Sequence, residues 1–192
     1  MYLLIVVGEE CIEDYKTGNK NILICRMGKR NYLKCKLESS FSTSASIVGI
    51  GLLLNFLLVQ WIYSDGTYLR YDGEYMVYNP ELMPETWLFE WSYTHPLLTN
   101  IIYIAVTMLF AGLIGMLGTV LSIVLHDRRL VYAITFAVWF IPILFKDSFM
   151  LVFQPFSEYG LRTIVPLAVW SAGLFIFLTV VLVIWEEKYI EI

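Results

Sequence analysis

The sequence predicts an all-α, polytopic integral membrane protein with about four transmembrane helices. Of its 192 residues, 58% are hydrophobic and only 16% are charged, and its mean hydropathy is +0.67. A single soluble core cannot bury that much apolar surface in a chain of this size, so the expected solvent is lipid. Trp and Tyr residues also gather near the ends of the apolar runs, where amphipathic rings prefer the membrane interface.

Four apolar runs match the ~20 residues that a helix needs to cross a hydrocarbon core of ~30 Å. Charged residues are absent from their interiors, and one Asp, Lys or Arg at mid-span would cost about 2.5–3.5 kcal/mol. The third run is uncharged as far as Phe145, and Pro142 near its end is expected to mark a kink or exit point. The predicted transmembrane segments are 44–63, 97–125, 130–147 and 163–185.

The Lys and Arg residues set the expected orientation of these spans. More than half of the 13 Lys and Arg residues lie between Glu9 and Glu38, and the positive-inside rule places such a segment in the cytoplasm. The loop 64–96 should then be extracellular, and it carries Arg70 against an excess of acids. The turn 126–129 returns to the inside with two arginines. We therefore expect a multi-pass protein of the plasma membrane with a cytoplasmic C-terminus.

The remaining segments complete the predicted organisation. An apolar stub at 1–8 looks like the end of a span, and it precedes a cytoplasmic basic segment at 9–43. Residues 148–162 are apolar yet interrupted by Pro155, which predicts a re-entrant or interfacial element. The tail 186–192 is expected in the cytoplasm.

The predicted extracellular loop is rich in aromatic and acidic residues. We interpret it as a small folded cap against the membrane surface, because interfacial aromatics are common. A second interpretation is that its rings and carboxylates contact a cationic substrate through cation–π and charge pairing. The aromatic residues are Tyr68, Tyr71, Tyr75, Tyr78, Trp87, Phe89, Trp91 and Tyr93.

The sequence offers no catalytic constellation, and we expect neither an enzyme nor a bound metal or cofactor. The two histidines, His95 and His126, are predicted on opposite sides of the membrane, so they cannot share a metal or a proton. Glu186 and Glu187 resemble the paired glutamates of intramembrane CAAX-type proteases, but their catalytic partners are missing, and we interpret the pair as a helix end in water. The cysteine spacing fits neither a CxxC pair nor a zinc site. The GxxxxGK[ST] loop that binds phosphate is also missing, which excludes ATP hydrolysis by that route.

Small residues in the second apolar run predict a helix-packing face. They recur at three- and four-residue spacing, so they share one side of a helix and let a neighbouring helix approach closely. Asn55 and Gln60 lie in the first span, and such uncharged polar residues more often hydrogen-bond a neighbouring helix than bind cargo. With no ionisable group at mid-span, ion or proton coupling has no evident carrier. The predicted packing residues are Ala111, Gly112, Gly115, Gly118 and Ser122.

Two stretches carry a resemblance to a known family. The first is Glu13-Asp14-Tyr15-Lys16-Thr17-Gly18, followed by Asn21-Ile22-Leu23, Arg26, Arg30-Asn31-Tyr32-Leu33 and Lys36. The second is HPLLTNIIYIAVTMLFAGLIGMLGTVLSIVLHDRRL, with its small-residue face. They resemble the cytoplasmic segment and the fourth span of bacterial ABC exporter permeases of the type-2 class.

The resemblance implies that the chain is the C-terminal portion of a permease that moves a substrate when a separate ATP-binding subunit drives it. A short coupling helix within 9–43 would dock onto that subunit, which holds the ATP and Mg, and a second permease chain would complete the transporter. Such permeases have six spans, so the chain would be a fragment lacking the first span and most of the second, or would work with a chain that supplies them. The residues implied at the coupling contact are Asp14, Tyr15, Lys16, Gly18, Arg26, Arg30, Tyr32 and Lys36.

Two alternatives stay open. The basic segment is also what a solvated loop anchored to anionic lipid would look like. The whole chain is also compatible with a non-transporting accessory or structural subunit of a larger membrane complex.

Overall fold

A computed structural model describes residues 2–62, 91, 95–144, 148–154 and 161–189. Within these ranges all regular secondary structure is helical, with six α-helices and two short 3-10 helices, which confirms the predicted all-α class. The predicted loop 64–96 lies almost wholly outside the described residues, and so does its aromatic cap. The helices are α1 (Tyr2–Lys16), α2 (Asn19–Met27), α3 (Lys29–Ile62), α6 (Pro96–Leu125), α7 (Arg128–Phe140), η2 (Ile141–Leu144), η3 (Phe149–Phe153) and α8 (Leu161–Tyr189).

Among the described residues, three helices are long and apolar enough to cross a membrane, which indicates a multi-pass membrane protein. They are α3, which contains the first predicted span as far as Ile62, and α6 and α8, which contain the second and fourth. The third predicted span, 130–147, corresponds to the 13-residue helix α7 and to η2, with its last three residues outside the described part. A helix of that length is only ~20 Å long. It ends just before Pro142, whose ring clashes with the carbonyl four residues earlier.

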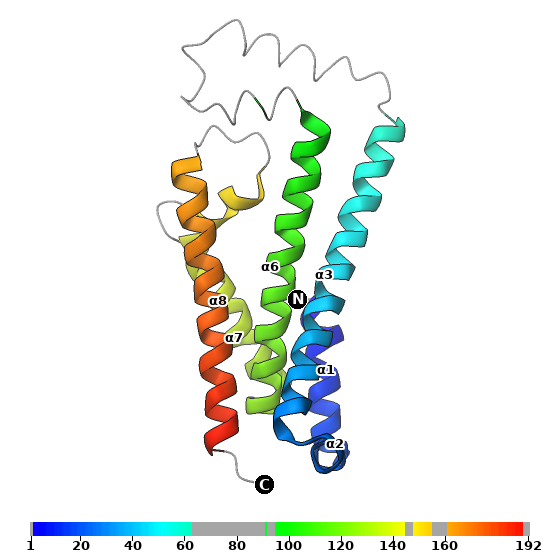
Figure 1. Ribbon diagram of the computed structural model, residues 1–192, viewed down its shortest axis with the longest axis vertical. Coiled ribbons are helices and arrows are strands. Elements are labelled where there is room, and N and C mark those ends of the chain that lie inside the picture. Colours follow the sequence, from blue (N-terminus) through cyan, green and yellow to red (C-terminus); the bar gives the residue numbers. More distant parts are fainter. Residues whose placement is uncertain (1, 63–90, 92–94, 145–147, 155–160, 190–192) are drawn as a thin grey trace, which may run out of the picture.

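Helix α6 is the centre of the molecule. In the apolar 18-residue stretch of α6, 67% of the residues are buried inside the molecule, whereas the corresponding stretches of α3 and α8 are 11% and 17% buried. Figure 1 shows α3 and α8 on either side of it, with α7 and α1 against its lower part. The three long helices run roughly along one axis, as a transmembrane bundle requires.

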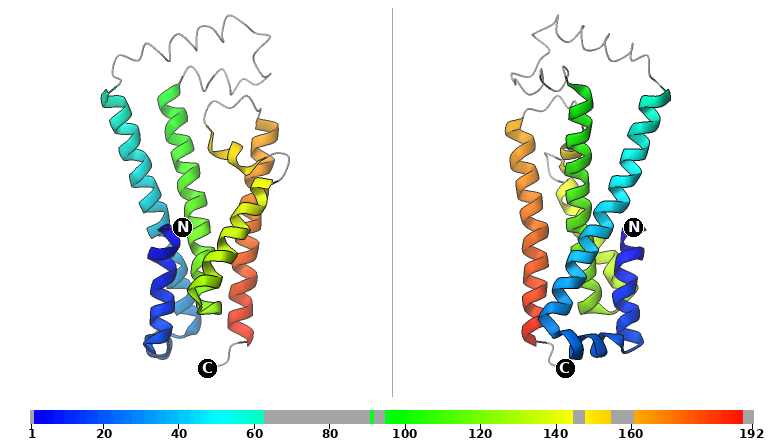
Figure 2. Two further views of the ribbon diagram at one scale, coloured as in Figure 1. Left: turned by 180° about the vertical axis from the view of Figure 1, so that it is seen from behind. Right: turned by 45° about the vertical axis from the view of Figure 1, so that its right-hand side comes forward.

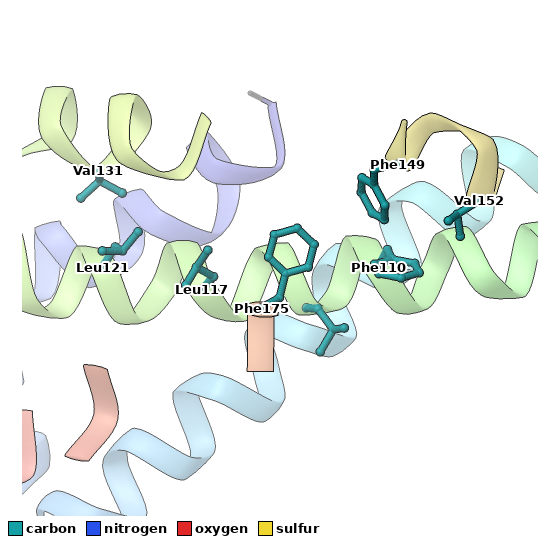
Figure 3. Packing of buried hydrophobic residues seen from close by; sticks show 8 residues of the cluster. Phe110, Leu117, Leu121, Val131, Phe149, Val152 and Phe175 are labelled. Carbon is teal, nitrogen blue, oxygen red and sulfur yellow. The ribbon is translucent and has the colours of Figure 1, made fainter. Parts of the chain in front are cut away.

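The main apolar core lies around α6 and includes the interrupted segment that follows α7. Phe110 of α6 contacts Phe149 of η3 edge to face, with ring centroids 5.1 Å apart, and Phe175 of α8 lies 6.0 Å from Phe149. Figure 3 shows these rings converging, with Val152 beside them. Ser148 begins η3 by accepting a hydrogen bond from the backbone N–H of Met150 at 3.3 Å. The first residues of the predicted re-entrant element therefore form a 3-10 turn packed into the core, and residues 155–160 lie outside the described part.

The amino-terminal region forms three helices separated by two glycines. Gly18 and Gly28 have φ of 77° and 81°, in the left-handed region that glycine adopts without a Cβ clash. From Tyr2, the predicted stub continues without a break into the acidic residues of α1, and the predicted first span forms the distal part of the longer helix α3 as far as Ile62. In Figure 2, α2 lies crosswise at the end of the bundle where α8 finishes.

Candidate functional site

The short helix α2 presents one face to the bundle and another to the outside. Lys20 and Ile24, four residues apart and so on one side of a helix, are 8% and 6% exposed. We call the exposed side chains that follow Lys20 the outer face of α2. It consists of Asn21, Ile22, Cys25, Arg26 and Met27, all of them exposed.

Two ion pairs and a charged hydrogen bond tie α2 and the start of α3 to the end of α8. The ammonium of Lys20 lies 3.1 Å from Oε1 of Glu186, which is 1% exposed. Lys29 donates a hydrogen bond to the backbone carbonyl of Glu186 at 2.7 Å. On the surface, Arg30 pairs with Glu187 at 3.3 Å. We call these contacts the α2–α8 link.

The α2–α8 link corrects one interpretation of the sequence. Glu187 is exposed, as expected of a helix end in water, but Glu186 is buried and paired, so for Glu186 the interpretation was wrong. The physical reason is that α2 folds over the end of α8 and brings Lys20 to a carboxylate that water would otherwise solvate. A buried charge with a close opposite charge tolerates the loss of water that an isolated one does not.

A second charge cluster joins α1 to α3. Lys36 lies 2.7 Å from Glu10 and 2.8 Å from Asp14, both on α1. Beside them, Cys11 is almost fully buried, and this burial raises the pKa of its thiol to about 11. Tyr32 also lies within this contact, 2% exposed.

A third set of contacts joins α1 to the turn between α6 and α7. Glu9 lies 3.5 Å from Arg128 and accepts a hydrogen bond from the hydroxyl of Tyr132 at 3.3 Å. The ring of Tyr15 lies over His126, with centroids 3.6 Å apart. Burial and the nearby charge of Lys20 lower the pKa of His126.

The structure divides the predicted coupling residues into two groups. Gly18 precedes α2, Arg26 lies on its outer face, and Lys16 and Arg30 are exposed at the same end of the molecule. Of the others, Asp14 pairs with Lys36 and Tyr32 is buried between helices, whereas Tyr15 packs on His126 and is 52% exposed.

The small residues of α6 form contacts with α3 and α1. A Cβ added to Gly112 would meet the ring of Phe41, and one added to Gly115 would meet Ser44, so both glycines allow α3 to approach closely. Further along, Ser122 faces Gly8 of α1, where an added Cβ would lie 2.8 Å from its hydroxyl oxygen. Ala111 is buried in the same helix, and the carbonyl of Gly118 accepts the hydroxyl of Ser122 at 2.8 Å.

Sequence reasoning missed the partners of this face on α3. The hydroxyl of Thr119 hydrogen-bonds that of Ser40 at 2.6 Å, and Ser40 and Ser44 are both buried. The available signal was the spacing of four residues between the two serines, just before an apolar run, which places them on one side of a helix.

A cleft opens between α3 and α6 at the end opposite α2. Its volume is about 280 Å³. The side-chain amides of Asn55 and Asn100 reach it, and within the described part of the chain neither makes a hydrogen bond. The lining residues are Leu52, Asn55, Phe56 and Val59 of α3, Asn100, Tyr103, Ile104 and Thr107 of α6, and Phe153 of η3.

Comparison with known proteins finds a relative that the chain matches over its whole length. The chain is 33% identical over 191 residues to a Bacillus subtilis (strain 168) protein named "Uncharacterized protein YybM", and the match covers 100% of this chain and 74% of the relative. No family model matches the chain, and no solved structure matches it.

Proposed function

This chain belongs to the family of the Bacillus subtilis protein YybM, and from its geometry we propose that it is a membrane-spanning permease subunit of an ABC-type exporter. The observation that carries the proposal is the position of α2. It is a short helix lying crosswise beneath the spans, with an exposed outer face and a buried connection to the last span. A separate ATP-binding subunit would dock on that outer face.

The outer face of α2 has the chemistry of a protein contact. Ile22 and Met27 are 54% and 42% exposed, and Arg26 lies beside them. Exposed apolar side chains next to an Arg are typical of the centre of a protein–protein interface. Lys20 and Lys36 pair with carboxylates, so they are not available to anionic lipid, whereas Lys16, Arg26 and Arg30 are exposed.

The α2–α8 link suggests how movement of α2 would reach the spans. Separating Lys20 from Glu186 would leave a buried charge without its partner, at a cost of about 3–5 kcal/mol. Displacement of α2 by the ATP-binding subunit therefore moves the end of α8 with it. Residue Lys29 adds a second connection, since it begins α3 and bonds the carbonyl of Glu186.

The proposal includes a fourth crossing by an interrupted segment. Helix α7, η2 and η3 together would make this crossing, with the C-terminus of the chain in the cytoplasm. Irregular backbone is tolerated at membrane depth only where protein covers it. Phe149 in η3 is fully buried among the rings of α6 and α8, which is consistent with that requirement. A second permease chain would pack against the apolar faces that remain exposed.

A photocrosslinker placed on Cys25 tests the proposal. Cys25 is exposed on the outer face of α2, and Cys11 is buried with a pKa of about 11, so in a Cys35→Ser background a benzophenone maleimide would label Cys25. Irradiation of native membranes should give an adduct with an ATP-binding-cassette subunit, and Arg26→Glu should reduce its yield at least about fivefold. The control is Arg129→Glu, which changes an exposed arginine at the same end but not on α2.

Three results are informative. Loss of the adduct in Arg26→Glu but not in Arg129→Glu supports docking through α2. An adduct with lipid in place of protein contradicts the permease proposal. An adduct with a membrane-embedded polypeptide alone would favour the accessory-subunit alternative.

A further inference from the structure

The cleft between α3 and α6 combines apolar walls with unpaired amides. Asn55 lies about two turns from the end of α3, and Asn100 about one turn from the start of α6. Both are therefore in the half of the bundle opposite α2. Leu52, Phe56 and Ile104 supply apolar surface between them.

Asn55 is exposed and Asn100 is half-buried, and where the cleft lies in lipid both amides need hydrogen-bond partners. A polar group in an apolar setting without such a partner costs on the order of 1–3 kcal/mol by mutational measures. The usual partner would be a neighbouring helix, but neither Asn55 nor Asn100 has one within the described part of the chain. Thr107, in the same wall, already donates to the carbonyl of Tyr103 at 2.8 Å. The two amides are thus left to bind something that enters the cleft.

We propose that this cleft binds an uncharged, single-chain amphiphile, whose ester, amide or hydroxyl groups pair with Asn55 and Asn100 and whose hydrocarbon chain lies along the apolar wall. An amide side chain both donates and accepts, so it complements such neutral groups. None of the described residues that line the cleft is charged, so an ionic group would find no counter-charge there. The volume of about 280 Å³ is at the small end of ligand pockets, which favours one chain over two.

The inference deepens the proposed function, on which it rests for one point only: in an exporter, the amphiphile would be the transported substrate. Binding itself does not depend on the ATP-binding subunit. A binding experiment with the purified chain in liposomes can therefore fail while α2 still docks its partner, and the reverse also holds.

The experiment uses a monoacylglycerol that carries a diazirine in its chain. The purified chain in phosphatidylcholine liposomes is irradiated with increasing probe, and the modified residues are identified by mass spectrometry. Labelling should saturate, fall with unlabelled monoolein, and concentrate on residues that line the cleft, such as Leu52, Phe56 and Ile104. A diazirine fatty acid, ionised at pH 8, should label the same residues more weakly.

Paired variants separate specific binding from simple exposure to lipid. Asn55→Leu combined with Asn100→Leu removes both amides, and the half-saturating probe concentration should rise about fivefold or more. Gln60→Leu is the matched control, because it replaces an exposed amide on the same helix that does not line the cleft. Each protein is first checked for a single gel-filtration peak. Equal labelling in all variants, or labelling that monoolein does not compete, would overturn the proposal.

Discussion

The two ends of the bundle are held together in different ways. At the α2 end, α1, α2, α3 and α8 are joined by buried charges and hydroxyls, and Ser44 and Ile12 have no exposed surface. At the opposite end, α3 diverges from α6 (Figures 1 and 2), and Leu57 and Trp61 are 60% and 80% exposed. Between described residues, the ion pairs and hydroxyl hydrogen bonds that join different helices lie at the α2 end.

This difference suggests that the two ends of the same helices have different roles. Helix α3 is held near Ser40 by a hydrogen bond to Thr119 and by close packing, and among the described residues it makes no such contact near Asn55. Movement imposed at the α2 end would be transmitted along rigid helices, and it would change the width of the cleft at the other end. Substitutions at the α2 end should therefore cost more stability than matched substitutions at the cleft end.

The largest effect is expected from Glu186→Ala. It leaves the ammonium of Lys20 buried without its carboxylate, which should lower the free energy of unfolding by about 3–5 kcal/mol. Glu187→Ala is the control, because its pair with Arg30 is on the surface and should contribute less than about 1 kcal/mol. Unfolding of the detergent-solubilised protein by SDS, followed by Trp fluorescence, measures both. Equal losses would show that the buried pair does not hold the α2 end.

A smaller loss is expected from Gly115→Ala. The added Cβ would meet Ser44 of α3, and overpacking of this kind costs about 1–3 kcal/mol. Gly51→Ala is the matched change at the cleft end, since nothing lies within 4 Å of a Cβ there. It should stabilise its helix by about 0.5–1 kcal/mol. The same SDS titration measures the difference, and a destabilised Gly51→Ala protein would contradict the comparison.

The parts of the fold that depend on local sequence were predictable, and those that depend on distant partners were not. The long apolar helices follow from hydropathy, which a short window of sequence contains. The burial of Glu186 depends on Lys20, which lies 166 residues earlier in the chain, and the residues next to Glu186 in sequence do not predict this pairing. In the sequence, Asp14 and Lys36 likewise have the pattern of surface charges. They pair because the two turns at Gly18 and Gly28 bring α1 against α3.

The cleft between α3 and α6 was also not predictable from the sequence. Asn55 was interpreted as a partner for a neighbouring helix, because such residues usually are. The two helices diverge at this depth, and the amide faces the cleft instead. Helical spacing predicts which residues share a face, but the angle between two helices depends on contacts elsewhere, here at Gly112 and Gly115.

Two threonines of α6 allow a test on one helix. Thr119 bonds Ser40 of α3 at 2.6 Å as well as its own helix, whereas Thr107 bonds only the carbonyl of Tyr103 among the contacts of the described residues. Thr119→Val should cost about 1 kcal/mol, the net value of one hydrogen bond. Thr107→Val loses a bond within its own turn and should stay within about 0.5 kcal/mol of the parent. If the two variants lose equal stability in the SDS titration, the interhelical bond contributes nothing at the α2 end.

The smallest effect is expected from pH, through His126. Its folded pKa lies below the ordinary value of 6.5, chiefly because of burial, so the unfolded chain binds the proton first as pH falls. Stability should therefore be complete above about pH 7.5 and decline as pH falls through about 6.5. The charged groups that influence its pKa are Lys20, which lowers it, and Glu186, which raises it. His126→Asn keeps a residue that tolerates the left-handed backbone at φ 55°. Thermal melts between pH 7.5 and 5.5 should show a flatter pH dependence for His126→Asn than for the parent. His95 is present in both proteins, so the difference is attributable to His126. Parallel curves would show that the contact of His126 with Tyr15 does not depend on a neutral ring.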